Sequence, residues 1–148
     1  MSAMSGILVG VDGSHHSERA LEWAMKEAAL RHVPLTVLAV HQVLVGWTGH
    51  GTAGYPEDAG LVEQTKTAAQ EQVDKVLAGL GGPRPERVTV RAVDGIPAEA
   101  LLNAAADADV IVVGARGAGG FARLRVGSVA DVVAHHAQCP VVIVPHDR

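Results

Sequence analysis

The residues best suited to ligand chemistry are concentrated between positions 114 and 128. This stretch contains five glycines, three arginines and a serine, and the residues that could serve a ligand site are Gly114, Gly117, Gly127, Arg116, Arg123, Arg125 and Ser128. Glycines let the backbone turn sharply and come close to a ligand. The free amides and positive dipole end of a helix that starts here suit a phosphate. The stretch is therefore a candidate anion site, in which Ser128 acts either as the N-cap or as a hydroxyl donor to phosphate oxygen.

Asp12 is a second candidate, because it directly follows a short apolar run. A carboxylate there can accept hydrogen bonds from a ligand, or it can close a turn by bonding its own backbone. Cys139 is the only cysteine, which excludes an internal disulfide and a multi-cysteine metal site. Its position before Pro140 is most simply that of a small buried residue.

The chain has eight histidines, which could in principle bind a metal ion, but their spacing does not match a metal site. They are His15, His16, His32, His41, His50, His135, His136 and His146. None forms His-x3-His on one helix face or the glutamate-containing motif of zinc proteases. The first pair is expected to flank a helix start. The pair at 135 and 136 is expected at a helix end, where a cationic histidine suits the dipole. His41 is expected to pack at a strand end.

Five strand-like apolar runs alternate with four helical stripes. The runs cover residues 7–11, 35–40, 88–93, 110–113 and 141–144, and the stripes cover residues 17–31, 61–80, 97–106 and 128–137. Runs that are apolar on both faces suit parallel strands covered on each side. Right-handed crossovers then predict a three-layer, doubly wound α/β sandwich with a five-stranded parallel sheet and four helices. The 148 residues fit a single domain.

In such a sheet, ligands bind outside the carboxyl ends of the strands, where the strand order reverses. The residues to inspect therefore follow the strands: 12–14, 40–42, 94–95 and the stretch from Gly114 onward. The connection from Gln42 to Glu57 is unusually long and contains four glycines and two aromatic residues. A connection of this length is expected to be a surface flap or, in a sharper interpretation, a lid over the strand ends.

Composition and charge exclude several function classes. The net charge is −4, from 12 basic and 16 acidic residues, and only four residues are aromatic. A nucleic-acid footprint and a base-stacking platform are therefore not expected. The apolar runs are too short to span a bilayer, so no membrane association is expected. Residues 1–6 do not read as a signal peptide, and we expect a cytoplasmic protein with a reduced cysteine.

Other phosphate motifs fail on particular residues. No lysine lies near the glycine-rich stretch, so it is not the P-loop of NTPases. The spacing Gly10-x2-Gly13 does not match a dinucleotide fingerprint. Gly10 also occupies the place of the nucleophilic aspartate of a haloacid-dehalogenase start. A response-regulator site would want a lysine after the fifth run, where Pro145 and His146 stand.

The spacing Gly114-x2-Gly117-x9-Gly127-Ser128 resembles the nucleotide-binding signature of the universal stress proteins. The resemblance covers nearly the whole chain and implies a parallel sheet with strand order 3-2-1-4-5. The other matching segments are Ile-Leu-Val-Gly-Val-Asp-Gly-Ser at 7–14, Ala20, Leu21 and Ala24 in the first helical stripe, Gly-Ile-Pro-Ala at 95–98 and Cys-Pro-Val-Val at 139–142.

The resemblance also implies an ATP site. Its residues are Gly10, Val11, Asp12, Val40, Val113, Gly114, Arg116, Gly117, Gly127, Ser128 and Val129. Asp12 would accept both ribose hydroxyls, and the backbone at Val40 would meet the adenine. Amides from Gly117 and residues 127–129 would surround the phosphates. A magnesium or manganese ion would be held by the phosphates rather than by protein ligands.

Two residues depart from the family pattern. Ala115 stands where Ser or Thr is frequent, so one hydroxyl donor is missing. Arg125 stands where an aliphatic residue is frequent, and we expect it to point to water rather than to the phosphates.

By resemblance, the chain is an ATP-binding regulator of a stress response, and at most a slow ATPase because no general base is evident. A cyclic-AMP-binding protein and an interaction module with a vestigial nucleotide site are the alternatives. The resemblance places residues 141–144 at the sheet edge, where pairing with a second copy would give a homodimer. Alternatively, Pro140, Pro145 and the charged tail cap that edge and leave a monomer.

Overall fold

The computed structural model describes residues 6–42, 58–115 and 127–145. Its elements are β1 (Gly6–Val11), α1 (His15–Arg31), β2 (Leu35–Gln42), α2 (Asp58–Gly79), β3 (Val88–Gly95), α3 (Pro97–Ala104), the 3₁₀ turn η1 (Ala105–Asp107), β4 (Ala108–Gly114), α4 (Ser128–His136) and β5 (Val141–Val144). Strands and helices alternate as predicted. No helix in these ranges is both long and apolar enough to cross a bilayer.

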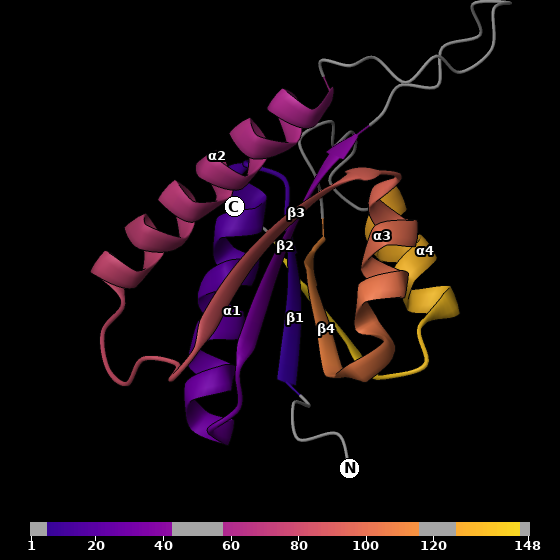
Figure 1. Cartoon of the computed structure of the whole chain (residues 1–148). Coiled ribbons are helices and arrows are strands. Elements are labelled where there is room, and N and C mark those ends of the chain that lie inside the picture. The colour runs from indigo at the N-terminus through magenta and orange to yellow at the C-terminus, as the bar shows by residue number, and fades with distance from the viewer. Residues whose placement is uncertain (1–5, 43–57, 116–126, 146–148) are drawn as a thin grey trace, which may run out of the picture.

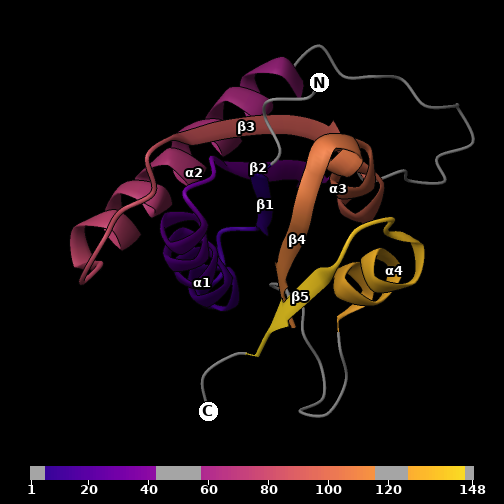
Figure 2. The ribbon, with the colours of Figure 1, turned by 90° about the horizontal axis from the view of Figure 1, so that it is seen from below.

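The five strands form one parallel sheet in the order β3-β2-β1-β4-β5, which confirms the strand order that the family resemblance implied. Figure 1 shows α1 and α2 on one side of the sheet and α3 and α4 on the other. The same three layers are seen from below in Figure 2. The predicted doubly wound α/β sandwich with four helices is therefore confirmed.

Each face of the sheet has its own apolar core. The first core cluster, under α1 and α2, includes Val9, Val37, Leu21, Met25 and Val73. The second core cluster, under α3 and α4, includes Leu8, Leu38, Ile111, Leu101 and Val133. Neighbouring residues of one strand point to opposite faces, so a sheet buried on both sides needs strands that are apolar in continuous runs.

Several elements have limits that differ from those predicted by apolar spacing. β2 continues to Gln42 and β3 to Gly95, two residues further than expected in each case. α1 begins at His15, because Ser14 caps it. α3 ends at Ala104 and passes into η1 instead of continuing as a helix. Apolar spacing marks only the buried part of an element, so exposed ends carry no such signal.

Candidate functional site

The strand order reverses between β1 and β4. The chain continues from β1 to β2 and β3 on one side of this point, and from β4 to β5 on the other. Ligands of doubly wound sheets bind outside the carboxyl ends of the strands at such a switch point. Asp12 follows β1 there, and Gly114 ends β4. The two predicted site regions therefore lie at the same edge of the sheet, on neighbouring strands.

The turn after β1 is built around the carboxylate of Asp12. Its Oδ1 accepts a hydrogen bond from the backbone N–H of Ser14, at 2.9 Å, and another from the Ser14 hydroxyl. Gly13 stands between them with a φ of +83°, a conformation that favours glycine. The predicted turn role of Asp12 is thus confirmed, and the turn holds this exposed residue at the edge of the sheet. Its ribose-binding role stays a prediction.

Ser14 then caps α1. Its hydroxyl oxygen accepts a hydrogen bond from the backbone N–H of Ser17 at 3.3 Å. The Ser17 hydroxyl donates back to the carbonyl oxygen of Ser14 at 2.9 Å. The first turn of α1 is therefore capped by side chains of the chain itself.

α4 starts in a different way, because its N-cap is Gly127. The Gly127 N–H donates to the carbonyl oxygen of Ala115, whose own N–H donates to the carbonyl oxygen of Val144 at 2.9 Å. The end of β4, the start of α4 and the end of β5 are thereby joined. Glycine has no side chain to cap the amides that follow, those of Ser128 and Val129. They remain suited to an anion.

One of the two roles predicted for Ser128 is wrong. Ser128 is the first helical residue of α4, so it cannot be the N-cap that we expected as one alternative. The helix begins one residue earlier than this alternative expected, because Gly127 already has the extended backbone of an N-cap, with φ −62° and ψ 160°. Ser128 is exposed, and its other predicted role, donating its hydroxyl to a phosphate oxygen, stays a prediction.

The predicted residues within the strands are mostly engaged in the core. Val11 and Val113 are only 6% and 3% exposed, so a ligand could meet their backbone but not their side chains. A Cβ at Gly10 would lie 2.9 Å from Leu101 Cδ2, so this glycine makes room for α3. Val40 is half-buried and packs against the second core cluster. The nucleotide contacts expected of these residues stay predictions.

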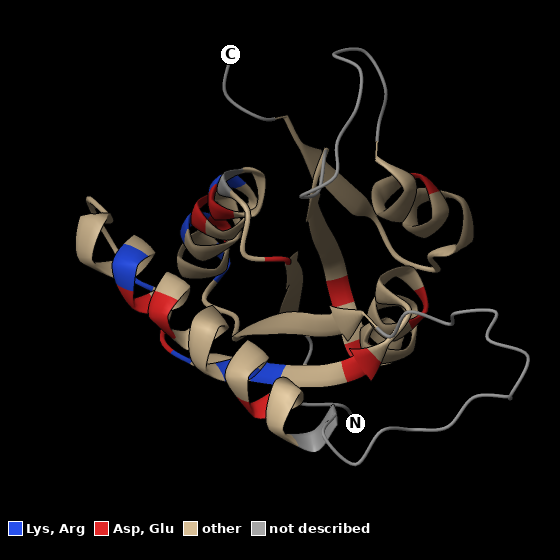
Figure 3. Cartoon of the chain, turned by 90° about the horizontal axis from the view of Figure 1, so that it is seen from above, with Lys and Arg blue, Asp and Glu red and all other residues tan. Residues whose placement is uncertain are grey.

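Several predicted features lie outside the described residues. They are Arg116, Gly117, Arg123, Arg125 and residues 43–57 of the expected flap or lid. In the part of the chain that the structure describes, all lysines and arginines lie between Arg19 and Arg91, on α1, α2, β3 and the connection before β3 (Figure 3). If the described residues at the start of α4 bind an anion, they must do so through backbone amides, the helix dipole and the Ser128 hydroxyl.

The histidines and the cysteine mostly lie as predicted. His41 is half-buried near the end of β2, opposite Asp94 of β3, which fits packing at a strand end. His135 and His136 form the last turn of α4. Cys139 is half-buried rather than buried, and this burial raises the pKa of its thiol. Within the described ranges, no three or more His, Cys, Asp or Glu side chains lie together in a way that could hold a metal ion.

Gln72 of α2 contacts the turn after β1, and no motif singled it out. Its side chain is buried, with 8% exposed, and its Nε2 donates a hydrogen bond to the carbonyl oxygen of Ser14 at 3.3 Å. The same nitrogen lies 3.5 Å from Ser17 Oγ. A signal was present in the sequence, since Gln72 interrupts the apolar stripe of α2 four residues before Val76. A polar residue within such a stripe indicates a buried hydrogen-bond partner.

A sequence model described as the universal stress protein family matches residues 4–145. The chain belongs to the universal stress protein family. A universal stress protein of Mycolicibacterium smegmatis is 37% identical over 147 residues, which cover 96% of this chain and 48% of that protein. This universal stress protein chain thus spans about half the length of the curated relatives it matches.

Two solved structures of similar proteins contain adenine nucleotides. A universal stress protein in complex with cAMP is 27% identical, with a TM-score of 0.66 over 97% of this chain and 98% of that one. The universal stress protein of Archaeoglobus fulgidus in complex with dAMP is 31% identical, with a TM-score of 0.58 over 97% of this chain and 98% of that one. Both proteins share the fold with this chain over nearly their whole length.

Proposed function

We propose that this universal stress protein binds ATP at the carboxyl edge of its sheet, between β1 and β4. The observation that carries the proposal is the hydrogen bond from Gly127 to Ala115, because it holds a glycine-capped helix start beside the end of β4. The amides and dipole of a helix start attract phosphate. The cAMP and dAMP complexes of similar proteins support an adenine nucleotide as the ligand class.

Each part of the nucleotide has a partner in this proposal. Asp12 takes the ribose, because a carboxylate accepts hydrogen bonds from both sugar hydroxyls. The backbone at Val40, near the end of β2, meets the adenine. The amides of Ser128 and Val129 hold the phosphates, together with residues 116–117, which lie outside the described part of the chain. The phosphates in turn hold a magnesium or manganese ion without protein ligands.

The proposed role is regulatory, in a stress response, with at most slow hydrolysis of ATP. Family membership supports this role. In the proposal, the bound nucleotide acts as a signal whose cellular level the protein senses. A cytoplasmic setting belongs to the same proposal, because that compartment supplies ATP.

Cyclic AMP is the second candidate, because a similar protein has been solved with it. Mass spectrometry of gently purified and then denatured protein identifies any ligand that co-purifies. ATP in the released fraction supports the proposal, and cyclic AMP supports the second candidate. If no nucleotide co-purifies and calorimetry with added ATP shows no binding, the interaction module with a vestigial site is favoured.

We also propose a homodimer in which β5 pairs with β5 of a second copy. β5 is one of the two edge strands, and Val141, Val142 and Ile143 are only half-buried there. Pairing about a twofold axis would satisfy the backbone groups of the edge and cover these side chains. Val142→Lys should shift the mass measured by light scattering toward the monomer. Val132→Lys, at a 38% exposed valine on α4, is the matched control and should not. A wild-type monomer at high concentration would defeat this proposal.

A further inference from the structure

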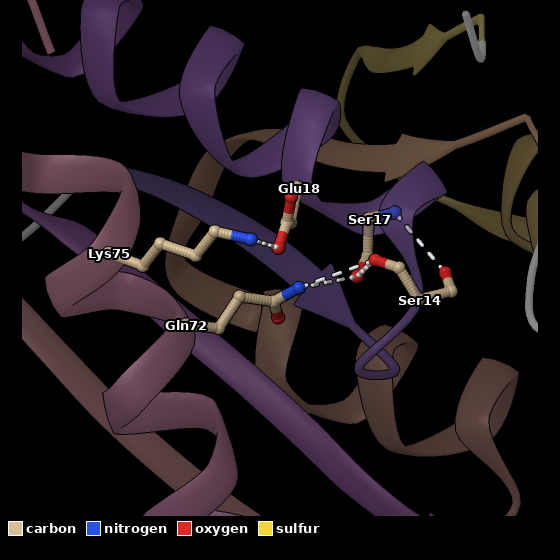
Figure 4. Close-up of polar contacts among 5 residues, drawn as sticks. All are labelled: Ser14, Ser17, Glu18, Gln72 and Lys75. Atoms are coloured by element: carbon tan, nitrogen blue, oxygen red, sulfur yellow. Dashed lines mark hydrogen bonds and ion pairs between the residues drawn. The ribbon is translucent and has the colours of Figure 1, made fainter. Parts of the chain in front are cut away.

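The side chain of Gln72 in α2 contacts Ser14 in the turn after β1 (Figure 4). Gln72 Nε2 donates to the carbonyl oxygen of Ser14 at 3.3 Å. Ser14 donates both its N–H, at 2.9 Å, and its hydroxyl to Asp12 Oδ1. A continuous series of polar contacts therefore runs from α2, through Ser14, to the predicted ribose-binding group.

Core packing does not explain a glutamine at this position. Gln72 is only 8% exposed, and its Oε1 is buried without a hydrogen-bond partner among the described residues. A buried carbonyl oxygen without a partner lowers the stability of the folded state, whereas an apolar side chain carries no such cost. The adjacent buried positions of α2, Ala69 and Val73, are apolar. An apolar side chain at position 72 could not make the hydrogen bonds that Gln72 Nε2 makes to the turn after β1.

A second contact joins the same two helices but differs in kind. Lys75 Nζ lies 2.9 Å from Glu18 Oε1, so α2 is also tied to the first turn of α1. The Lys75 side chain is 67% exposed, and exposed ion pairs contribute little to stability because water and salt screen them. Its partner, Glu18, belongs to α1 and not to the turn after β1. Lys75 is therefore a matched control for Gln72.

We propose that Gln72 is a positioning residue of the nucleotide site. By holding the carbonyl oxygen of Ser14, it fixes the turn after β1 and thereby the direction in which the Asp12 carboxylate faces the ribose. This inference rests on the proposed nucleotide-binding function. Gln72 touches the turn rather than the ligand, so its effect reaches the nucleotide only through Asp12.

Hydrogen exchange tests the contact without any nucleotide. Gln72→Met removes the amide donors and keeps a long side chain, and the variant should fold because methionine suits a buried position in the α2 stripe. The amides of Ser14 and Ser17, followed by NMR in the full chain, should exchange faster in Gln72→Met and at the wild-type rate in Lys75→Met. Wild-type exchange at both serines in Gln72→Met would overturn the positioning role. This comparison remains decisive if the wild-type protein binds no nucleotide, a result that would defeat the proposed function itself.

Calorimetry tests the route through Asp12. Gln72→Met should weaken ATP binding by about two- to tenfold, the range of one neutral hydrogen bond. It should weaken 2′,3′-dideoxy-ATP less, because that ligand lacks the hydroxyls that Asp12 would accept. Lys75→Met should leave both affinities unchanged. Equal losses for the two ligands in Gln72→Met, or no loss for ATP, would overturn the proposal.

Discussion

Two of the helices that start at the carboxyl edge of the sheet, α1 and α4, follow the neighbouring strands β1 and β4 and have differently capped first turns. Ser14 caps α1 with its hydroxyl, whereas the cap of α4 is Gly127, which has no side chain. Both helices carry an acidic residue at their fourth position, Glu18 and Asp131, so charge does not separate them. Any helix start has a positive dipole end and first-turn amides that lack partners within the helix. The difference in capping therefore leaves the first-turn amides of α4, rather than those of α1, available to a bound anion.

The largest effect should come from giving the cap of α4 a side chain. Gly127→Val should abolish ATP binding, because the branched side chain would fill the space in front of the first-turn amides. The fold should survive, since the φ of Gly127 is −62°, which valine can adopt. Calorimetry measures the affinity, and circular dichroism checks the fold. Gly81→Val is the matched control, because a Cβ there meets open space. Wild-type affinity in folded Gly127→Val would reject the α4 site.

A smaller loss is expected at the turn before α1. Asp12→Ala should weaken ATP binding by about 1.5–3 kcal/mol, the contribution of hydrogen bonds to a charged group. It should weaken 2′,3′-dideoxy-ATP much less. Asp12→Asn separates the two roles of this residue, because asparagine can still close the turn through its side-chain oxygen. If Asp12 serves only the turn, the asparagine variant will bind ATP like the wild type in calorimetry. Equal losses of both ligands in Asp12→Ala would count against the ribose role.

The smallest effects should distinguish the two serines. Ser14→Ala should lower the free energy of unfolding by about 1 kcal/mol, as the loss of an N-cap does. Ser128→Ala should change it by less than about 0.5 kcal/mol, because Ser128 is exposed and is not the cap. Urea denaturation measures both. Similar stability losses in the two variants would contradict the difference in capping.

The sequence predicts the layers of the fold better than the start of each helix. Continuous apolar runs and helical stripes follow directly from burial on both faces of a parallel sheet, so the element order could be predicted. The strand order needed the family resemblance. A Gly-Ser pair stands at the start of both α1 and α4, at 13–14 and at 127–128. The φ of Gly13 is +83° and that of Gly127 is −62°, so the serine becomes the cap in one case and the first helical residue in the other. Glycine can adopt either φ value, so the Gly-Ser pair alone does not predict which residue will be the N-cap.

The contact between Gln72 and Ser14 could not be predicted from the sequence, for a different reason. It reaches Ser14 across 58 positions of sequence, so its partner depends on how α2 crosses the sheet. A polar residue within the stripe indicated that a partner exists but could not name it. The predicted contacts of Arg116 and Gly117 lie outside the described residues and stay predictions.

The central claim is that the start of α4, and not the start of α1, receives the phosphates. An NMR titration of the full chain with ATP, and in parallel with adenosine, isolates the contribution of the phosphates to each backbone amide. We expect the amides of Ser128 and Val129 to shift with ATP and not with adenosine, while those of His16 and Ser17 respond equally to both ligands. Shifts specific to ATP at His16 and Ser17, with none at Ser128 and Val129, would contradict the account.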